Sequence, residues 1–95
     1  MAVLVEDNPA RRRFEILIDG SLVGYARYTP RQDRVIFTHT EVDPAYRDKG
    51  VGTALARAAL DQIRARGDRV EAKCPFIAAF INRHREYAEL LISAS

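Results

Sequence analysis

The chain has 95 residues, a formal net charge of +2 and a sequence pI near 9.0. This length suits one domain, predicted to span residues 1–95, because most domains contain roughly 100 to 200 residues. Hydrophobic residues make up 47% of the sequence and charged residues 29%, a balance that excludes a disordered chain. The longest apolar run, Phe76–Ile81, is far shorter than the ~20 residues of a membrane helix, so we expect no membrane-spanning segment.

Two further features bear on location. Glu6 and Asp7 interrupt the only apolar stretch near the N-terminus, so we expect no secretory signal peptide. A single cysteine, Cys74, cannot form an intrachain disulfide, which fits a reducing compartment. We therefore expect a cytoplasmic protein that is a monomer or a weak homodimer and has no membrane partner.

The positive charge is carried mainly by arginine, in two clusters at Arg11–Arg13 and Arg83–Arg85. Arginine suits recognition of phosphate and carboxylate groups through paired hydrogen bonds, although a solvated surface explains the first cluster at least as well. Acidic residues are interspersed through the whole chain, and no stripe of aromatic and basic residues is present. The sequence therefore predicts no nucleic-acid partner, and it predicts no metal site.

The first half of the chain predicts an antiparallel meander. Phe14, Ile16 and Ile18 recur with a period of two, and Asp19-Gly20 favours a tight hairpin turn. A second strand is expected over Ser21–Tyr28 and a third over Arg34–Val42. Val3–Val5 adds a possible short strand before them.

The second half changes to a helical period. Residues Val51–Arg66 are rich in good helix formers, and Gly67 suits the position after the helix. Four apolar positions recur every four residues and predict the stripe that faces the sheet: Val51, Leu55, Ala59 and Ile63.

A short strand over Val70–Cys74 and one or two helices from Phe76 to about Leu91 complete the prediction. The apolar residues of this segment are expected to face inward: Phe76, Phe80, Leu90 and Leu91. The fold class is therefore α+β, a meander followed by a right-handed parallel strand-helix-strand crossover and a C-terminal helix.

The strongest functional signal lies in Val42–Thr53, which joins the third strand to the long helix. Gly50 and Gly52 allow the backbone to approach a ligand closely, and the helix that follows directs unsatisfied N–H groups at the same point. Arg47 and Lys49 add positive charge, and Thr53 adds a hydroxyl group. The segment predicts a phosphate or pyrophosphate site, against the simpler interpretation of a strand-to-helix turn. It matches neither the Walker nor the Rossmann glycine pattern.

The motif Arg47-x-x-Gly50-x-Gly52, followed by Thr53-Ala54-Leu55, resembles the acyl-CoA pyrophosphate loop of the GNAT superfamily of N-acetyltransferases. The resemblance covers about residues 14–91 and is closest to the minimal, single-domain members. It implies a GNAT-like sandwich, acetyl-CoA (CoA) as cofactor and an amine as acceptor. It also implies the residues of the cofactor site: Val42, Arg47, Asp48, Lys49, Gly50, Val51, Gly52 and Thr53.

Acyl transfer from a thioester to an amine needs a base and a proton for the leaving thiolate. His39 and Glu41 are expected on the strand face that also carries Val35 and Phe37, just before the glycine loop. Histidine is a residue type suited to proton transfer near neutral pH, so His39 is a candidate general base. An exposed strand end explains the same two residues equally well.

Cys74 is another candidate, because a helix start and Lys73 beside it both favour the thiolate form. A buried cysteine that acts as a small hydrophobic residue is the simpler alternative. We predict that Cys74 lies beside the sulfur end of the cofactor as an accessible thiol that reacts readily with alkylating agents, and that CoA protects it. A covalent route through acetyl-Cys74 then competes with direct transfer to the amine.

The resemblance suggests further roles near the C-terminus. Tyr87 is a candidate proton donor to the CoA thiolate, with a packing role as the default. Asn82, Arg83 and Arg85 are candidates to reach the cofactor's 3′-phosphate, although a solvated helix face explains them equally well.

The sequence thus favours an acetyl-CoA-dependent N-acetyltransferase with an unidentified amine acceptor. Typical GNAT members continue with strands that help to form the acceptor site, whereas here only a helical segment follows Cys74. A non-catalytic module that binds CoA or acyl-CoA is therefore the alternative.

Overall fold

A computed structural model describes residues 2–92; Met1 and residues 93–95, which the predicted domain includes, lie outside the described residues. Five strands form one sheet in the order β1-β2-β3-β4-β5. Neighbouring strands are antiparallel from β1 to β4, and β5 pairs parallel with β4. The strands are β1 (Val3–Asn8), β2 (Arg13–Ile18), β3 (Ser21–Pro30), β4 (Arg34–Val42) and β5 (Arg69–Ala72).

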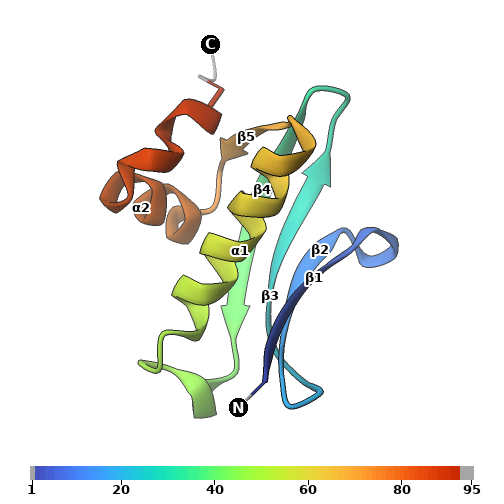
Figure 1. Cartoon of the computed structure of the whole chain (residues 1–95), viewed down its shortest axis with the longest axis vertical. Helices are drawn as coiled ribbons and strands as arrows, with labels where there is room; N and C mark the ends of the chain where they lie inside the picture. The colour runs from blue at the N-terminus through green and yellow to red at the C-terminus, as the bar shows by residue number, and fades with distance from the viewer. Residues whose placement is uncertain (1, 93–95) are drawn as a thin grey trace.

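The helices complete the predicted α+β arrangement. Helix α1 (Val51–Arg66) connects β4 to β5 and packs across all five strands, and α2 (Pro75–Arg83) packs beside it against β4 and β5 (Figure 1). Short 3-10 segments cover η1 (Pro9–Arg11), η2 (Pro44–Tyr46) and η3 (Arg85–Leu90). Within residues 2–92, no helix is long and apolar enough to cross a membrane.

The β2–β3 hairpin confirms the turn predicted from Asp19-Gly20. Asp19 has φ of 50° and Gly20 has φ of 84°, and positive angles at both central residues match the twist of paired strands. The first strand is longer than the predicted Val3–Val5, because it pairs with β2 as far as Asn8↔Arg13.

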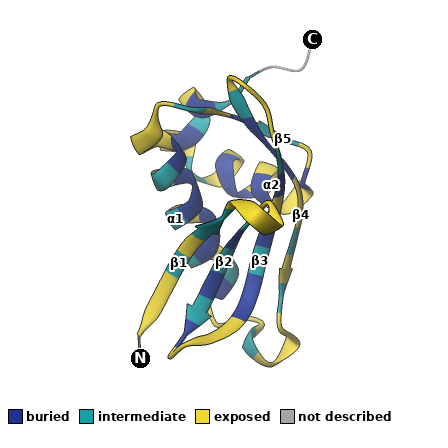
Figure 2. Ribbon diagram, turned by 90° about the vertical axis from the view of Figure 1, so that its right-hand side faces the viewer, coloured by how far each residue is buried: buried dark blue, intermediate teal, exposed yellow. Residues whose placement is uncertain are grey.

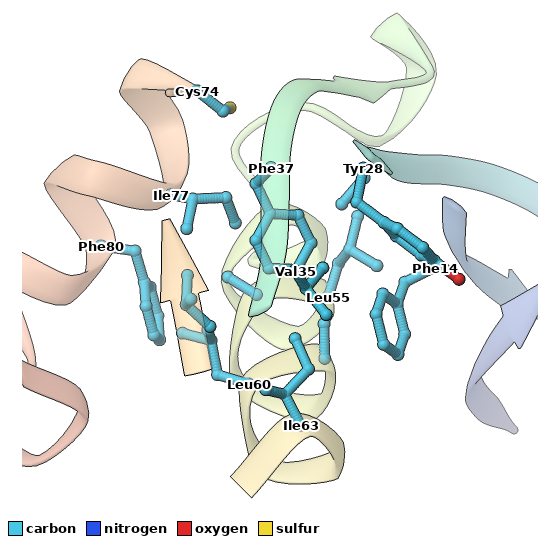
Figure 3. Packing of buried hydrophobic residues seen from close by; sticks show 14 of the residues in the cluster. Phe14, Tyr28, Val35, Phe37, Leu55, Leu60, Ile63, Cys74, Ile77 and Phe80 are labelled. Carbon is cyan, nitrogen blue, oxygen red and sulfur yellow. The ribbon is translucent and has the colours of Figure 1, made fainter. Parts of the chain in front are cut away.

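One hydrophobic core lies between the sheet and the two helices. The predicted stripe of α1 is buried at all four positions, and Ala56 beside it brings the helix close to the sheet. Phe37 of β4 is fully buried, with Leu55 of α1 on one side and Ile77 of α2 on the other (Figure 3). Gly67, with φ of 78°, caps the end of α1 as predicted.

The C-terminal half departs from the prediction at two places. Phe76 does not face inward: it is 36% exposed, because α2 turns Ile77, Phe80 and Ile81 to the core instead. The last strand ends before Cys74. The N–H groups of residues 73 and 74 both donate to the carbonyl of Phe37, and the regular β4–β5 hydrogen bonding ends there.

A β-bulge in β4 determines which side chains face the helices. The pairing with β3 shifts from Tyr28↔Phe37 to Arg27↔His39, which leaves Thr38 as an extra residue. Beyond the bulge, each side chain of β4 points to the face opposite to the one that strict alternation predicts. Residues 35–37 of β4 are buried, and the residues that follow them are partly or fully exposed.

The expectation that His39 and Glu41 share the face of Val35 and Phe37 is therefore wrong. Val35 and Phe37 are buried under the helices, whereas the side chains of His39 and Glu41 are 52% and 60% exposed. They project from the opposite side of the sheet, here called the outer face. The connection that follows β4 is also largely exposed (Figure 2).

Candidate functional site

The site begins where β4 and β5 diverge. Their parallel pairing ends at Phe37↔Ala72, while β4 continues to Val42 (Figure 1). Asp43 donates its N–H to the carbonyl of Val23 on β3, at 2.8 Å. Because backbone groups alternate in direction along an antiparallel strand, the N–H and C=O groups of Thr40 and Val42 face the side that β5 has left.

A compact loop then leads from β4 to α1. The carboxylate of Asp43 accepts a hydrogen bond from the N–H of Ala45 at 2.9 Å and so begins the η2 turn. Asp48 and Gly50 adopt positive φ angles of 61° and 76°, which direct the chain into the helix. Gly50 is the N-cap residue of α1, and as a glycine it has no side chain to cap the helix.

The first turn of α1 is an anion-binding arrangement. Ala54 donates to the carbonyl of Gly50 at 2.9 Å, so the N–H groups of residues 50–53 precede the first intrahelical bond. This turn contains no acidic residue, and the exposed Arg47 and Lys49 add positive charge beside it. Free N–H groups and the positive end of the helix dipole together can hold a phosphate.

The loop and the open edge of β4 form one cleft of about 690 Å³. Most residues predicted for the cofactor site line it: Val42, Arg47, Asp48, Gly50, Val51, Gly52 and Thr53. The other lining residues are His39, Thr40, Glu41, Pro44, Tyr46 and Phe76. Lys49 adjoins the cleft without lining it.

Phe76 lines the cleft, whereas the sequence predicted that it faces the core. A Cβ atom on Gly52 would stand 2.8 Å from Cζ of this ring, so glycine at position 52 allows the ring to lie over the first turn of α1. The helical spacing could have shown the exposure of Phe76, because Ile77, Phe80 and Ile81 form one buried stripe of α2 and Phe76 lies outside it. Thr40 and Tyr46 were also missed, the first because the bulge turns it into the cleft.

His39 and Glu41 form a hydrogen-bonded group at the outer rim of the cleft. Nε2 of His39 lies 3.2 Å from Oε1 of Glu41, and the hydroxyl of Tyr25 donates to Oε2 at 3.1 Å. These hydrogen bonds, first from His39 and then from Tyr25, hold the pKa of Glu41 below its ordinary value. With Nε2–H donating to the carboxylate, Nδ1 of His39 is left to accept a proton.

Cys74 lies behind the cleft rather than in it. Its side chain is 2% exposed and is drawn with the buried cluster in Figure 3. Sγ of Cys74 lies 3.3 Å from Oγ1 of Thr40, which lines the cleft. The expectation of an accessible thiol is wrong for this structure, because Cys74 belongs to the hydrophobic core.

Tyr87 is not brought to the cleft. It is 3% exposed, its ring packs on Phe80, and its hydroxyl donates to the carboxylate of Asp61 at 2.6 Å. Burial, and then this hydrogen bond, raises the pKa of Tyr87. These contacts agree with the packing role that was the default prediction for Tyr87.

The three polar residues of the C-terminal segment also lie away from the glycine loop. Asn82 and Arg85 line a second cavity of about 390 Å³, together with residues of β5 and the segment after η3. Arg83 is exposed and lines neither cavity.

A sequence model described as GCN5-related N-acetyl-transferase matches residues 13–90. The match covers the sheet from β2 onward, the loop, and both helices. The chain therefore belongs to the GCN5-related N-acetyltransferase family.

Individual relatives agree with this membership. The protein NATD1 of Danio rerio is 32% identical over 93 residues, which cover 93% of this chain and 84% of that protein. The mycothiol acetyltransferase of Nocardia farcinica is 42% identical over 62 residues, 58% of this chain and 20% of that protein. The solution structure of a GCN5-like protein of Staphylococcus aureus superposes with a TM-score of 0.71 at 17% identity and covers 97% of this chain and 90% of that one, which shows the shared fold.

Proposed function

We propose that this protein is an acetyl-CoA-dependent N-acetyltransferase that acts on an amine. The observation that carries the proposal is the continuity of the cleft. At one end the cleft has the free N–H groups of α1, along its length it has the open edge of β4, and at its rim it has the His39–Glu41 pair.

The residues of the cleft suit the successive parts of coenzyme A. The N–H groups of residues 50–53 and the guanidinium of Arg47 would hold the pyrophosphate. The backbone groups of Thr40 and Val42 would pair with the amides of the pantetheine arm, as a strand does in a sheet. When bound, acetyl-CoA supplies an acetyl thioester, which is open to attack by an amine.

His39 is the proposed general base. Its Nδ1 takes the proton of the amine, either directly or through one water molecule, while Glu41 holds the ring through Nε2. Bound acetyl-CoA would supply the acetyl carbon to the amine nitrogen that His39 deprotonates, with the CoA thiolate as the leaving group and solvent as the source of its proton. The burial of Cys74 favours this direct route over a covalent one.

A module that binds CoA without catalysis is the second candidate. It is favoured by the placement of Cys74 and Tyr87, since neither of these candidate catalytic side chains lines the cleft. The two candidates share the cofactor site and differ only in turnover.

Two measurements test the proposal. Coenzyme A at about one hundred times its Kd should add about 2.7 kcal/mol to the free energy of unfolding and raise the melting temperature, whereas an oligonucleotide should not. Release of free thiol from acetyl-CoA in the presence of an amine panel then separates an enzyme from a binder. Failure of CoA to bind would remove both candidates, and binding without thiol release would favour the module. Cytoplasmic location, a monomeric or weakly dimeric state, and the absence of nucleic-acid and membrane partners stay predictions.

A further inference from the structure

The outer face beside His39 carries an arginine, Arg27, that makes no ion-pair contact within the described residues, although its charge helps to lower the pKa of Glu41. Arg27 of β3 lies directly opposite His39 in the β3–β4 pair. Side chains paired in this way have Cβ atoms about 4.5 to 5.5 Å apart. The exposed guanidinium of Arg27 lies over the ring of Tyr25, 5.5 Å from its centroid.

Two other charged groups near Arg27 on this face already have partners. Glu41 has one oxygen against His39 and the other against Tyr25. Arg13 is paired with Glu15 at 2.7 Å. Within residues 2–92, the guanidinium of Arg27 makes no ion pair and donates no side-chain hydrogen bond.

A second cation lies across the point where β4 and β5 diverge, here called the fork. The ammonium of Lys73, just after β5, is 3.6 Å from Glu71, whose carboxylate is already bonded to Arg34 at 2.9 Å. The side chain of Lys73 is 65% exposed. Lys73 lines the second cavity, so the positive charge that a molecule meets beside His39 on the outer face is that of Arg27.

We infer that the acceptor is an amine that also carries an anionic group, a carboxylate or a phosphate, which Arg27 binds while the amine lies at His39. This inference rests on the proposed function. A guanidinium offers five N–H donors in a planar fork that matches either anion. An acceptor with a second positive charge would instead place that charge beside Arg27, which would repel it.

Matched amines test the inference on the CoA-loaded protein. Amide NMR spectra are recorded during titration with β-alanine against β-alaninamide, and with O-phosphoethanolamine against ethanolamine. In at least one pair, the amine that carries a carboxylate or phosphate should shift the amide signals of Arg27 and His39. It should also bind at least about tenfold more tightly than its partner that lacks the anionic group. Comparison of the two pairs distinguishes carboxylate from phosphate.

Variants of the arginine supply the control. Arg27→Gln should remove the preference for the anionic amine, and Arg27→Lys should keep part of it. Arg31→Gln, which removes an exposed arginine in the β3–β4 turn, should leave the preference unchanged. None of these variants should alter the affinity for CoA.

Three results would overturn the inference while leaving the cofactor site intact. The first is equal or tighter binding of the amines that lack an anionic group, or of the diamine putrescine. The second is retention of the preference in Arg27→Gln, and the third is an outer face on which no amine binds although CoA does. Loss of CoA binding in the wild-type protein would instead refute the proposed function.

Discussion

Replacing Gly52 with glutamate is expected to separate CoA binding from folding. The new Cβ would stand 2.8 Å from the tip of the Phe76 ring, and that ring is partly exposed and can move away. A glycine within a helix costs about 1 kcal/mol relative to alanine. An acidic side chain in the first turn of a helix adds roughly 0.3 to 1 kcal/mol of stability. The free energy of unfolding should therefore be unchanged or slightly higher in Gly52→Glu.

The effect on CoA should have the opposite sign. The carboxylate would stand among the N–H groups of residues 50–53, where the proposed pyrophosphate lies. Two like charges about 4 Å apart near a protein surface repel by about 4 kcal/mol, which corresponds to a loss of roughly a thousandfold in affinity. The displaced Phe76 adds to this loss by removing one wall of the cleft.

Isothermal titration with CoA and urea unfolding measure the two effects on the same preparation. Ala65→Glu introduces the same charge at an exposed position in the last turn of α1 and should bind CoA normally. Gly52→Ala, alone and combined with Phe76→Ala, separates the loss caused by the ring from the loss caused by the added side chain. Wild-type CoA affinity in Gly52→Glu would refute the assignment of the loop.

Four other substitutions have distinct expected outcomes. Arg47→Ala should weaken CoA binding by roughly 1 to 3 kcal/mol in titration calorimetry, and no change would exclude a phosphate contact. His39→Ala should lower the rate of thiol release by about 10² to 10⁴ without changing CoA affinity; an unchanged rate would exclude it as the base. Tyr87→Phe should lower the melting temperature at neutral pH by removing the hydrogen bond to Asp61, yet retain transfer. Because the pKa of Tyr87 is raised in the folded protein, this contribution is complete below about pH 10 and is lost as pH rises further. Cys74→Ala should keep transfer activity, and intact-mass measurement after incubation of the wild type with acetyl-CoA should find no acetyl adduct on Cys74; an adduct would restore the covalent route.

The regular elements could be predicted because their signals are local. The bounds of α1 agree with the prediction, since the stripe from Val51 to Ile63 is continuous and Gly67 ends it. The bounds of β4 also agree, because β-branched and aromatic residues follow Arg34 until the loop begins. The glycine loop could be predicted for the same reason, because its residues are contiguous in sequence. Most of its predicted residues line one cleft.

The catalytic candidates could not be placed in the same way, because their positions depend on tertiary packing. Cys74 follows a strand and precedes a helix, features that fit either a reactive or a buried thiol. Its burial results from the packing of α2 on β4, which no local pattern encodes. Tyr87 is held by Asp61, a partner that lies on a different helix.

The bulge at Thr38 had no signal in the sequence, and it connects the main features of the site. By adding one residue to β4, it turns His39 and Glu41 to the outer face and Thr40 into the cleft. Pairing with β5 ends one residue earlier, so the free edge of β4 begins at the same point. The cleft therefore opens between the strands, while the proposed base stands on the side of the sheet away from α1. A cofactor held by α1 and an amine arriving at the outer face would meet across this fork, so both can be bound at once. Simultaneous binding removes the need for an acyl-cysteine that separates the two steps in time, and the burial of the only cysteine agrees with that conclusion.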